Sequence, residues 1–141
     1  MDLKLSNTKE IRWKQRFSNF EKAFKLLEEG ISLTRDASNI VKEGAIKRFE
    51  YTFELAWKTL KDYMEHGGII TNLPREVIKQ AFANGLILDG EAWIDMLEKR
   101  NLIAHTYDEK NFETVFNLIT QKYFQAINQV YDLLSKKNKE T

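Results

Sequence analysis

The chain has 141 residues, 30% of them charged, with a formal net charge of +1 and no cysteine. At this length residues 1–141 are predicted to form one domain that buries its own core, and the absence of cysteine excludes disulfides and thiolate metal sites. Because positive and negative charges nearly cancel, the chain has no overall positive potential that would hold a long nucleic acid. Its start does not resemble a signal peptide, and it has no apolar run long enough to cross a bilayer, so we expect a cytoplasmic protein without a membrane span.

Two long amphipathic helices are predicted in the first half of the chain. Apolar residues recur at steps of four and three in both segments, first at Trp13, Phe17, Phe20, Phe24, Leu27 and Ile31, then at Ile46, Phe49, Phe53, Ala56, Leu60 and Tyr63. Gly30 is expected to end or fray the first helix. The second is expected to be the most buried, to start at Ser38 or Asn39 and to end at residues 66–68, where two glycines accept positive φ.

Two shorter helical segments follow. Pro74, preceded by Thr71 or Asn72 as cap, opens a short helix that residues 84–85 close; its apolar positions are Val77, Ile78, Ala81 and Phe82. Residues 89–90 start a fourth helix, which carries Trp93, Met96 and Leu97 and continues into the segment beginning at residue 100.

A last helix is predicted to begin between Thr106 and Glu109, whose spacing resembles a capping box. It carries apolar residues at Phe112, Val115, Phe116, Ile119, Tyr123, Ile127, Val130 and Leu134, and residues 135–141 form a polar tail expected to fray. The fold class predicted is therefore all-α, an antiparallel up-and-down bundle of four main helices plus one short helix.

The segment RNLIAHTYDE concentrates most of the usable chemistry of the chain. It places Arg100, Asn101, His105 and Tyr107 close together, and His105 is one of only two histidines. A guanidinium holds a phosphate through two parallel hydrogen bonds, a neutral imidazole transfers a proton near neutral pH, and an amide orients either group. These residue types favour chemistry on a phosphodiester. The histidines and carboxylates lack the spacing of metal ligands, so no metal or other cofactor is expected.

Arg100 occupies a position where the helical pattern expects an apolar residue. A buried guanidinium must be paired or must face a polar cavity. Two interpretations follow from this: Arg100 forms a structural ion pair with Glu50 or Glu54, or it lines a cleft that accepts a phosphate.

Arg100 and His105 are five residues apart, which corresponds to roughly 140° around an ideal helix. One straight helix therefore cannot aim both side chains at the same atom. Either the helix ends before His105, or a second copy of the chain completes the site across a two-fold axis.

Three segments, taken together and in this order, resemble a known family over nearly the whole chain. They are IKRFEYTFELAWKTLKDY at 46–63, PREVIKQAF with GLI at 74–87, and RNLIAHTYDE at 100–109. The last resembles the arginine, polar residue and histidine signature of the higher-eukaryote and prokaryote nucleotide-binding (HEPN) domains. The combination is similar to the nucleotidyltransferase substrate-binding proteins, a HEPN subfamily.

The resemblance implies a helical bundle that dimerises and acts beside a small nucleotidyltransferase, which carries the catalytic carboxylates. Many HEPN domains are metal-independent endoribonucleases, and several such pairs are toxin and antitoxin. Carried over to this sequence, the ribonuclease residues are Arg100 and His105, Asn101 is the polar helper, and Tyr107 is the tyrosine to which the partner adds AMP.

Two functions from different classes are therefore expected. The first is a metal-independent ribonuclease toxin with its site at a dimer interface, neutralised by its nucleotidyltransferase. The second is a non-catalytic subunit that binds a substrate or nucleotide for that enzyme, which the near-neutral charge mildly favours. The expected partners are the small nucleotidyltransferase, a second copy of the chain, alone or within a heterotetramer, and RNA or a nucleotide.

Overall fold

The computed structural model describes the backbone of residues 3–140 and the side chains of residues 7–140, and every regular element among them is helical. These elements are α1 (Leu3–Ser32), α2 (Asn39–His66), α3 (Pro74–Ala83), α4 (Gly90–Glu98), α5 (Arg100–Ala104), α6 (Glu109–Leu118), the π-helical turn η1 (Ile119–Tyr123) and α7 (Phe124–Lys139). The predicted all-α bundle is confirmed. None of the helices in the described part of the chain is both long and apolar enough to cross a lipid bilayer.

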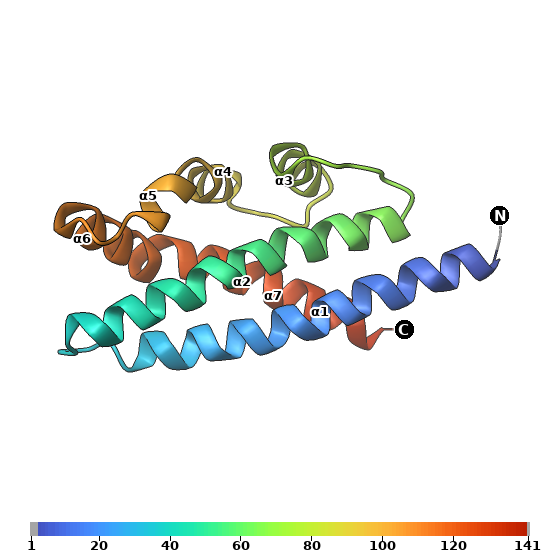
Figure 1. The fold of residues 1–141 in the computed structure, drawn as a ribbon. Coiled ribbons are helices and arrows are strands. Elements are labelled where there is room, and N and C mark those ends of the chain that lie inside the picture. Colours follow the sequence, from blue (N-terminus) through green and yellow to red (C-terminus); the bar gives the residue numbers. More distant parts are fainter. Residues whose placement is uncertain (1–2, 141) are drawn as a thin grey trace.

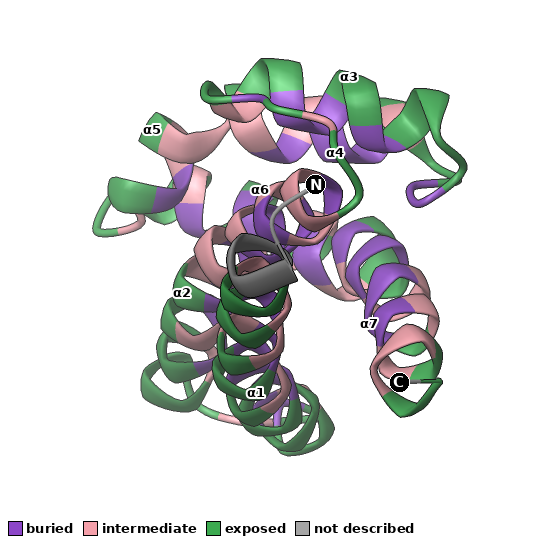
Figure 2. Cartoon of the chain, turned by 90° about the vertical axis from the view of Figure 1, so that its right-hand side faces the viewer, coloured by how far each residue is buried: buried purple, intermediate pink, exposed green. Residues whose placement is uncertain are grey.

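Three long helical rods carry the architecture. Helices α1 and α2 form an antiparallel hairpin, and α6, η1 and α7 follow one another without a break to form the third rod, which contacts both (Figure 1). Helices α3 and α4 lie across α2, on the side away from α1 (Figures 1 and 2). The three rods hold the main core, and the short helices cover its remaining side.

Aromatic side chains fill the core between the rods. Phe24 of α1 stacks on Tyr131 of α7 with ring centroids 4.4 Å apart, and Phe49 of α2 stacks on Tyr123 of η1 at 5.6 Å. The predicted α1 stripe is buried from Trp13 to Leu27. Aromatic pairs stabilise a fold by more than the burial of their apolar area alone, so these stacks fix how the rods face one another.

The prediction that Gly30 ends the first helix is wrong. Helix α1 continues to Ser32, and Gly30 lies buried at its crossing with α2. A Cβ built on Gly30 would stand 3.2 Å from Cδ of Arg48. The glycine therefore allows a close approach of two helices instead of terminating one.

Helix α2 has the predicted limits, since Ser38 is its N-cap residue and Gly67 its C-cap residue, although the Ser38 side chain makes no capping hydrogen bond. Gly68 adopts the predicted positive φ, at +95°, whereas the prediction is wrong for Gly67, whose φ is −84°. Helix α3 begins at Pro74 as predicted, but its N-cap residue is Leu73 and not Thr71 or Asn72. Proline at the first helical position removes one of the backbone N–H groups that would lack an intrahelical partner, and its fixed φ suits the start of a helix.

Two aspartates cap the later helices. The Asp89 side chain accepts a hydrogen bond from the backbone N–H of Ala92, which confirms the predicted start of α4. The last rod, however, starts at Glu109 and is capped by Asp108, which accepts from the N–H groups of Lys110 and Asn111. The predicted capping box from Thr106 is therefore wrong, because a carboxylate directly before the helix satisfies these N–H groups instead.

The predicted frayed tail at 135–141 is also corrected, because α7 remains helical through Lys139; Thr141 lies outside the described residues. Phe82, expected among the apolar positions of α3, is 54% exposed, whereas Val77, Ile78 and Ala81 are buried. It lies one helical residue beyond the stripe that faces α2, at the edge of a cavity described below.

Candidate functional site around Arg100

The fourth predicted helix is divided at Lys99, which ends α4 and precedes α5. Helix α5 then has only five residues, and His105 follows it with φ −117° and ψ 41°. The backbone carbonyl of His105 accepts a hydrogen bond from Nδ2 of Asn111 at 3.2 Å, which ties the turn to α6. The helix thus ends before His105, the first of the two arrangements considered from the sequence.

Arg100 is paired with Glu54 of α2. Its Nη2 donates to both carboxylate oxygens, at 2.7 and 2.8 Å, and its Nε donates to Oε2 at 3.1 Å. Glu54 in turn accepts a hydrogen bond from Nε1 of Trp57 at 3.1 Å. The predicted ion pair is therefore made with Glu54, whereas Glu50 lies 3.9 Å from Nζ of Lys47.

The same arginine also lines a groove, so the two interpretations of Arg100 are compatible. The guanidinium carbon lies 5.9 Å from the ring centre of Phe53, and the side chain is 40% exposed. We call the space between α2 and α5, about 480 Å³, the Arg100 groove; its polar and charged lining includes Lys47, Glu50, Glu54, Arg100 and Asn101.

His105 and Tyr107 lie beyond this groove. Both side chains are exposed, Tyr107 to 85%, and their rings meet edge to face with centroids 5.5 Å apart. Tyr107 and Thr106 line a smaller groove of about 340 Å³ that also contacts Lys47 and Glu50 of α2. Within one chain, Arg100 and Asn101 share one groove, while His105 contacts Tyr107 and lines neither.

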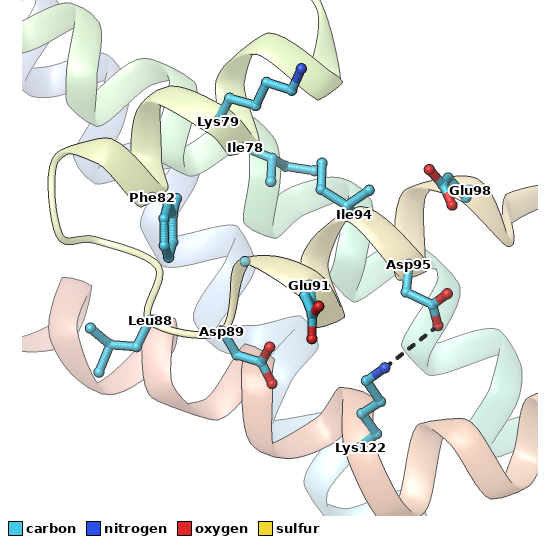
Figure 3. Close-up of a pocket in the computed structure, with 11 residues that line it drawn as sticks. Ile78, Lys79, Phe82, Leu88, Asp89, Glu91, Ile94, Asp95, Glu98 and Lys122 are labelled. Atoms are coloured by element: carbon cyan, nitrogen blue, oxygen red, sulfur yellow. Dashed lines mark ion pairs between the residues drawn. The ribbon is translucent and has the colours of Figure 1, made fainter.

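A further cavity, of about 900 Å³, lies between α3, α4 and η1 (Figure 3), and none of the predicted site residues lines it. Its apolar lining is Ile78, Phe82, Leu88 and Ile94, and its charged lining includes Asp89, Glu91 and Lys122. The sequence pattern gave no signal for this cavity, because its lining comes from separate elements and Leu88, 70% exposed, lies in a loop.

Asp95, at the edge of that cavity, is the centre of a partly buried polar network. It accepts hydrogen bonds from Nζ of Lys99 at 2.7 Å and from the hydroxyl of Tyr123, and Nζ of Lys122 lies 4.0 Å away. Burial raises the pKa of Asp95, but the hydrogen bonds from Lys99 and Tyr123 and the two lysine charges outweigh it, so its pKa is lowered. Burial, reinforced by the bond to Asp95, raises the pKa of Tyr123.

Among the described residues, no three His, Cys, Asp or Glu side chains are grouped as a metal site would require. The chemistry of the Arg100 groove is therefore argued from its arginine, its amide and its two carboxylates, each of which pairs with a cation.

The chain is similar to several known proteins. It is 34% identical to a protein of known crystal structure from Thermus thermophilus, with a TM-score of 0.73 over 82% of this chain and 98% of that one. A Haemophilus influenzae structure, described as revealing the fold of a substrate binding domain of a nucleotidyltransferase, has the same fold, with a TM-score of 0.73, 24% identity and coverage of 84% and 98%.

Curated proteins add one relative, named probable ribonuclease HepT, from Haemophilus influenzae. It is 31% identical over 78 residues, which are 52% of this chain and 53% of that protein, so the match spans about half the length of each. Residues 15–136 match the family described as nucleotidyltransferase substrate binding protein like. Because this match covers most of the chain, the protein belongs to the nucleotidyltransferase substrate binding protein like family.

Proposed function

We propose that the chain is a HEPN-type subunit of a two-component nucleotidyltransferase system, a toxin that cleaves RNA without a metal ion and is neutralised by its partner enzyme. One observation carries the proposal: Arg100 and Asn101 line an open groove, and His105 is exposed just after the same short helix. The relative named probable ribonuclease HepT supports the proposal.

In the required reaction the 2′-hydroxyl oxygen attacks the adjacent phosphorus and forms a 2′,3′-cyclic phosphate, while the bond from that phosphorus to the 5′-oxygen of the next nucleotide breaks and the 5′-oxygen leaves as a hydroxyl. His105 moves a proton, either from the attacking hydroxyl or to the leaving oxygen, and Arg100 stabilises charge on the phosphoryl oxygens. Because His105 does not line the Arg100 groove, we place the reaction at a contact between two chains, where His105 of one copy approaches Arg100 of the other.

Neutralisation is assigned to Tyr107. Its hydroxyl, on a side chain 85% exposed, is accessible to a second enzyme. In this proposal the partner transfers AMP from ATP to the phenol oxygen and releases pyrophosphate. The added phosphate is negative and bulky and lies next to His105, so it obstructs an RNA strand at the site.

The test is cleavage of end-labelled cellular RNA by the purified chain in excess EDTA. We expect the parent to cleave and His105→Ala and Arg100→Ala to be inactive. The matched controls, His66→Ala at the other histidine and Arg75→Ala at a surface arginine paired with Glu98, should cleave like the parent. Cleavage that persists in His105→Ala, or that disappears equally in the controls, would contradict the assigned roles.

A non-catalytic, substrate-binding subunit is the second candidate, and the cavity between α3 and α4 favours it. Its volume of about 900 Å³ and its apolar walls with a few charged groups are typical of sites for small molecules. This candidate predicts no RNA cleavage by the chain alone. It also predicts that Ile94→Glu, inside the cavity, impairs transfer by the nucleotidyltransferase while His105→Ala does not.

A further inference from the structure

Glu54 holds Arg100 through the hydrogen bonds that an arginine uses to recognise phosphate. A carboxylate and a phosphate present similar pairs of oxygens to the planar fork of a guanidinium. In this chain Nε and Nη2 already donate to the two oxygens of Glu54. An edge of Arg100 that suits a phosphate is therefore occupied by a group of the protein itself.

The position of Glu54 is fixed from its own helix. Trp57, one turn further along α2, donates from Nε1 to Oε1 of Glu54 at 3.1 Å, and the Trp57 side chain is buried. The ring of Phe53 lies beside the guanidinium. Arg100 is thus pre-oriented in the groove, and the carboxylate that orients it also neutralises it.

The other charged side chains of the groove do not make it more positive. Lys47 and Glu50, which also line the groove, lie close enough to form an ion pair at 3.9 Å. Two cations therefore face two anions, and an approaching phosphate meets little net attraction. The Glu54 and Arg100 side chains are 38% and 40% exposed, so solvent weakens their pairing and a competing anion has access to it.

We propose that Glu54 is an internal competitor for phosphate: it positions Arg100 and lowers the affinity of the Arg100 groove for a nucleic-acid backbone, so that a bound phosphate takes its place on the guanidinium. This inference rests on the proposed nucleic-acid function and adds to it a regulatory residue outside the motif at 100–109. Glu54→Gln should keep a hydrogen-bond acceptor for both Arg100 and Trp57 while it removes the competing charge.

The experiment measures binding of a fluorescent 2′-O-methyl oligonucleotide, which has no 2′-hydroxyl and cannot be cleaved, by anisotropy at several salt concentrations. We expect Glu54→Gln to bind several-fold more tightly than the parent. The slope of log affinity against log salt should be the same in both proteins, because a phosphate contacts Arg100 in each, and it should become shallower by about 0.7, the value for one phosphate contact on a single strand, when Arg100 is replaced by alanine. The gain should disappear when Arg100→Ala is added.

Glu50→Gln is the matched control, because it removes the same charge from the same groove without touching Arg100. If it strengthens binding as much as Glu54→Gln, or if the gain survives in the double variant with Arg100→Ala, the inference is wrong. Trp57→Phe, which removes the hydrogen bond to Glu54, provides a second variant and should shift binding in the same direction by less. Unchanged binding in Glu54→Gln would also overturn it.

The outcome is separable from that of the ribonuclease proposal. If the chain does not cut RNA but Glu54→Gln binds more tightly through Arg100, the competitor role holds and the catalytic proposal fails. If the chain cuts RNA and Glu54→Gln binds like the parent, the catalytic proposal holds and the competitor role fails.

Discussion

Two tyrosines of the last rod donate hydrogen bonds to carboxylates, and both bonds link separate elements. The Tyr123 hydroxyl donates to Asp95 of α4, and the Tyr131 hydroxyl donates to Glu21 of α1 at 2.7 Å. Burial, followed by the bond to Glu21, raises the pKa of Tyr131 from 10.0 to about 12. Each tyrosine must remain protonated to keep its bond, so the contacts between these elements depend on pH.

Tyr131 should therefore make the fold sensitive to alkali. A group whose pKa is raised on folding contributes stability that is fully present below its unfolded pKa and is lost as pH rises through its folded pKa. For Tyr131 that range is from about pH 10 to about pH 12. Denaturant unfolding from about pH 9 upward should show falling stability in the parent and a smaller fall in Tyr131→Phe. Parallel losses in the two proteins would rule out this contribution.

At the scale of the element, two helical glycines offer a matched comparison. Gly44 lies in α2 with nothing within 4 Å of an added Cβ, whereas Gly30 in α1 faces Arg48, whose Nη1 donates to the carbonyl of Leu26 at 2.6 Å. Gly44→Ala should raise the free energy of unfolding by about 0.5–1 kcal/mol, because alanine is the better helix former.

Gly30→Ala has the same intrinsic advantage but must displace the Arg48 side chain, so we expect it to be at least about 1 kcal/mol less stable than Gly44→Ala. Thermal and denaturant unfolding of both variants under the same conditions measure the difference. Equal stabilisation by the two substitutions would show that the α1–α2 crossing adjusts without cost.

Periodicity located the long helices because their buried faces repeat every three or four residues. It could not show that Gly30 is a contact, since a glycine near the end of an apolar stripe has the same pattern whether it ends a helix or lets a neighbour approach. The π-helical turn at Ile119–Tyr123 was equally hidden: Ile119 and Tyr123 are both buried, as they would be in a regular helix. The break at Lys99 has neither glycine nor proline to mark it.

At the scale of the whole molecule, some features of the candidate site follow from the sequence, and others are determined only by the tertiary structure. The sequence identified the residue types and narrowed the partner of Arg100 to Glu50 or Glu54. Only the packing of α5 on α2 selects Glu54, because both glutamates lie on the same helix, four residues apart. The sequence also required either that the helix end before His105 or that a second chain complete the site. The helix does end before His105, but within the single chain His105 lies outside the Arg100 groove.

A site shared between two chains predicts complementation. Arg100→Ala and His105→Ala should each be inactive as homodimers, whereas a mixed dimer retains one complete pair, with Arg100 from one chain and His105 from the other. Equal amounts of the two variants, allowed to exchange subunits, form mixed dimers in about half of the population with one working site in each. RNA cleavage should therefore recover to about a quarter of the parental rate.

The control mixes Arg100→Ala with a double variant that lacks both side chains, in which no intact pair forms and no activity should return. If both residues act within one chain, the first mixture also stays inactive, although size-exclusion chromatography shows dimers. In that case a conformational change would have to bring His105 to the Arg100 groove, since α5 and the turn after it hold the two side chains in different surroundings. Complementation thus decides whether the catalytic unit is one chain or two.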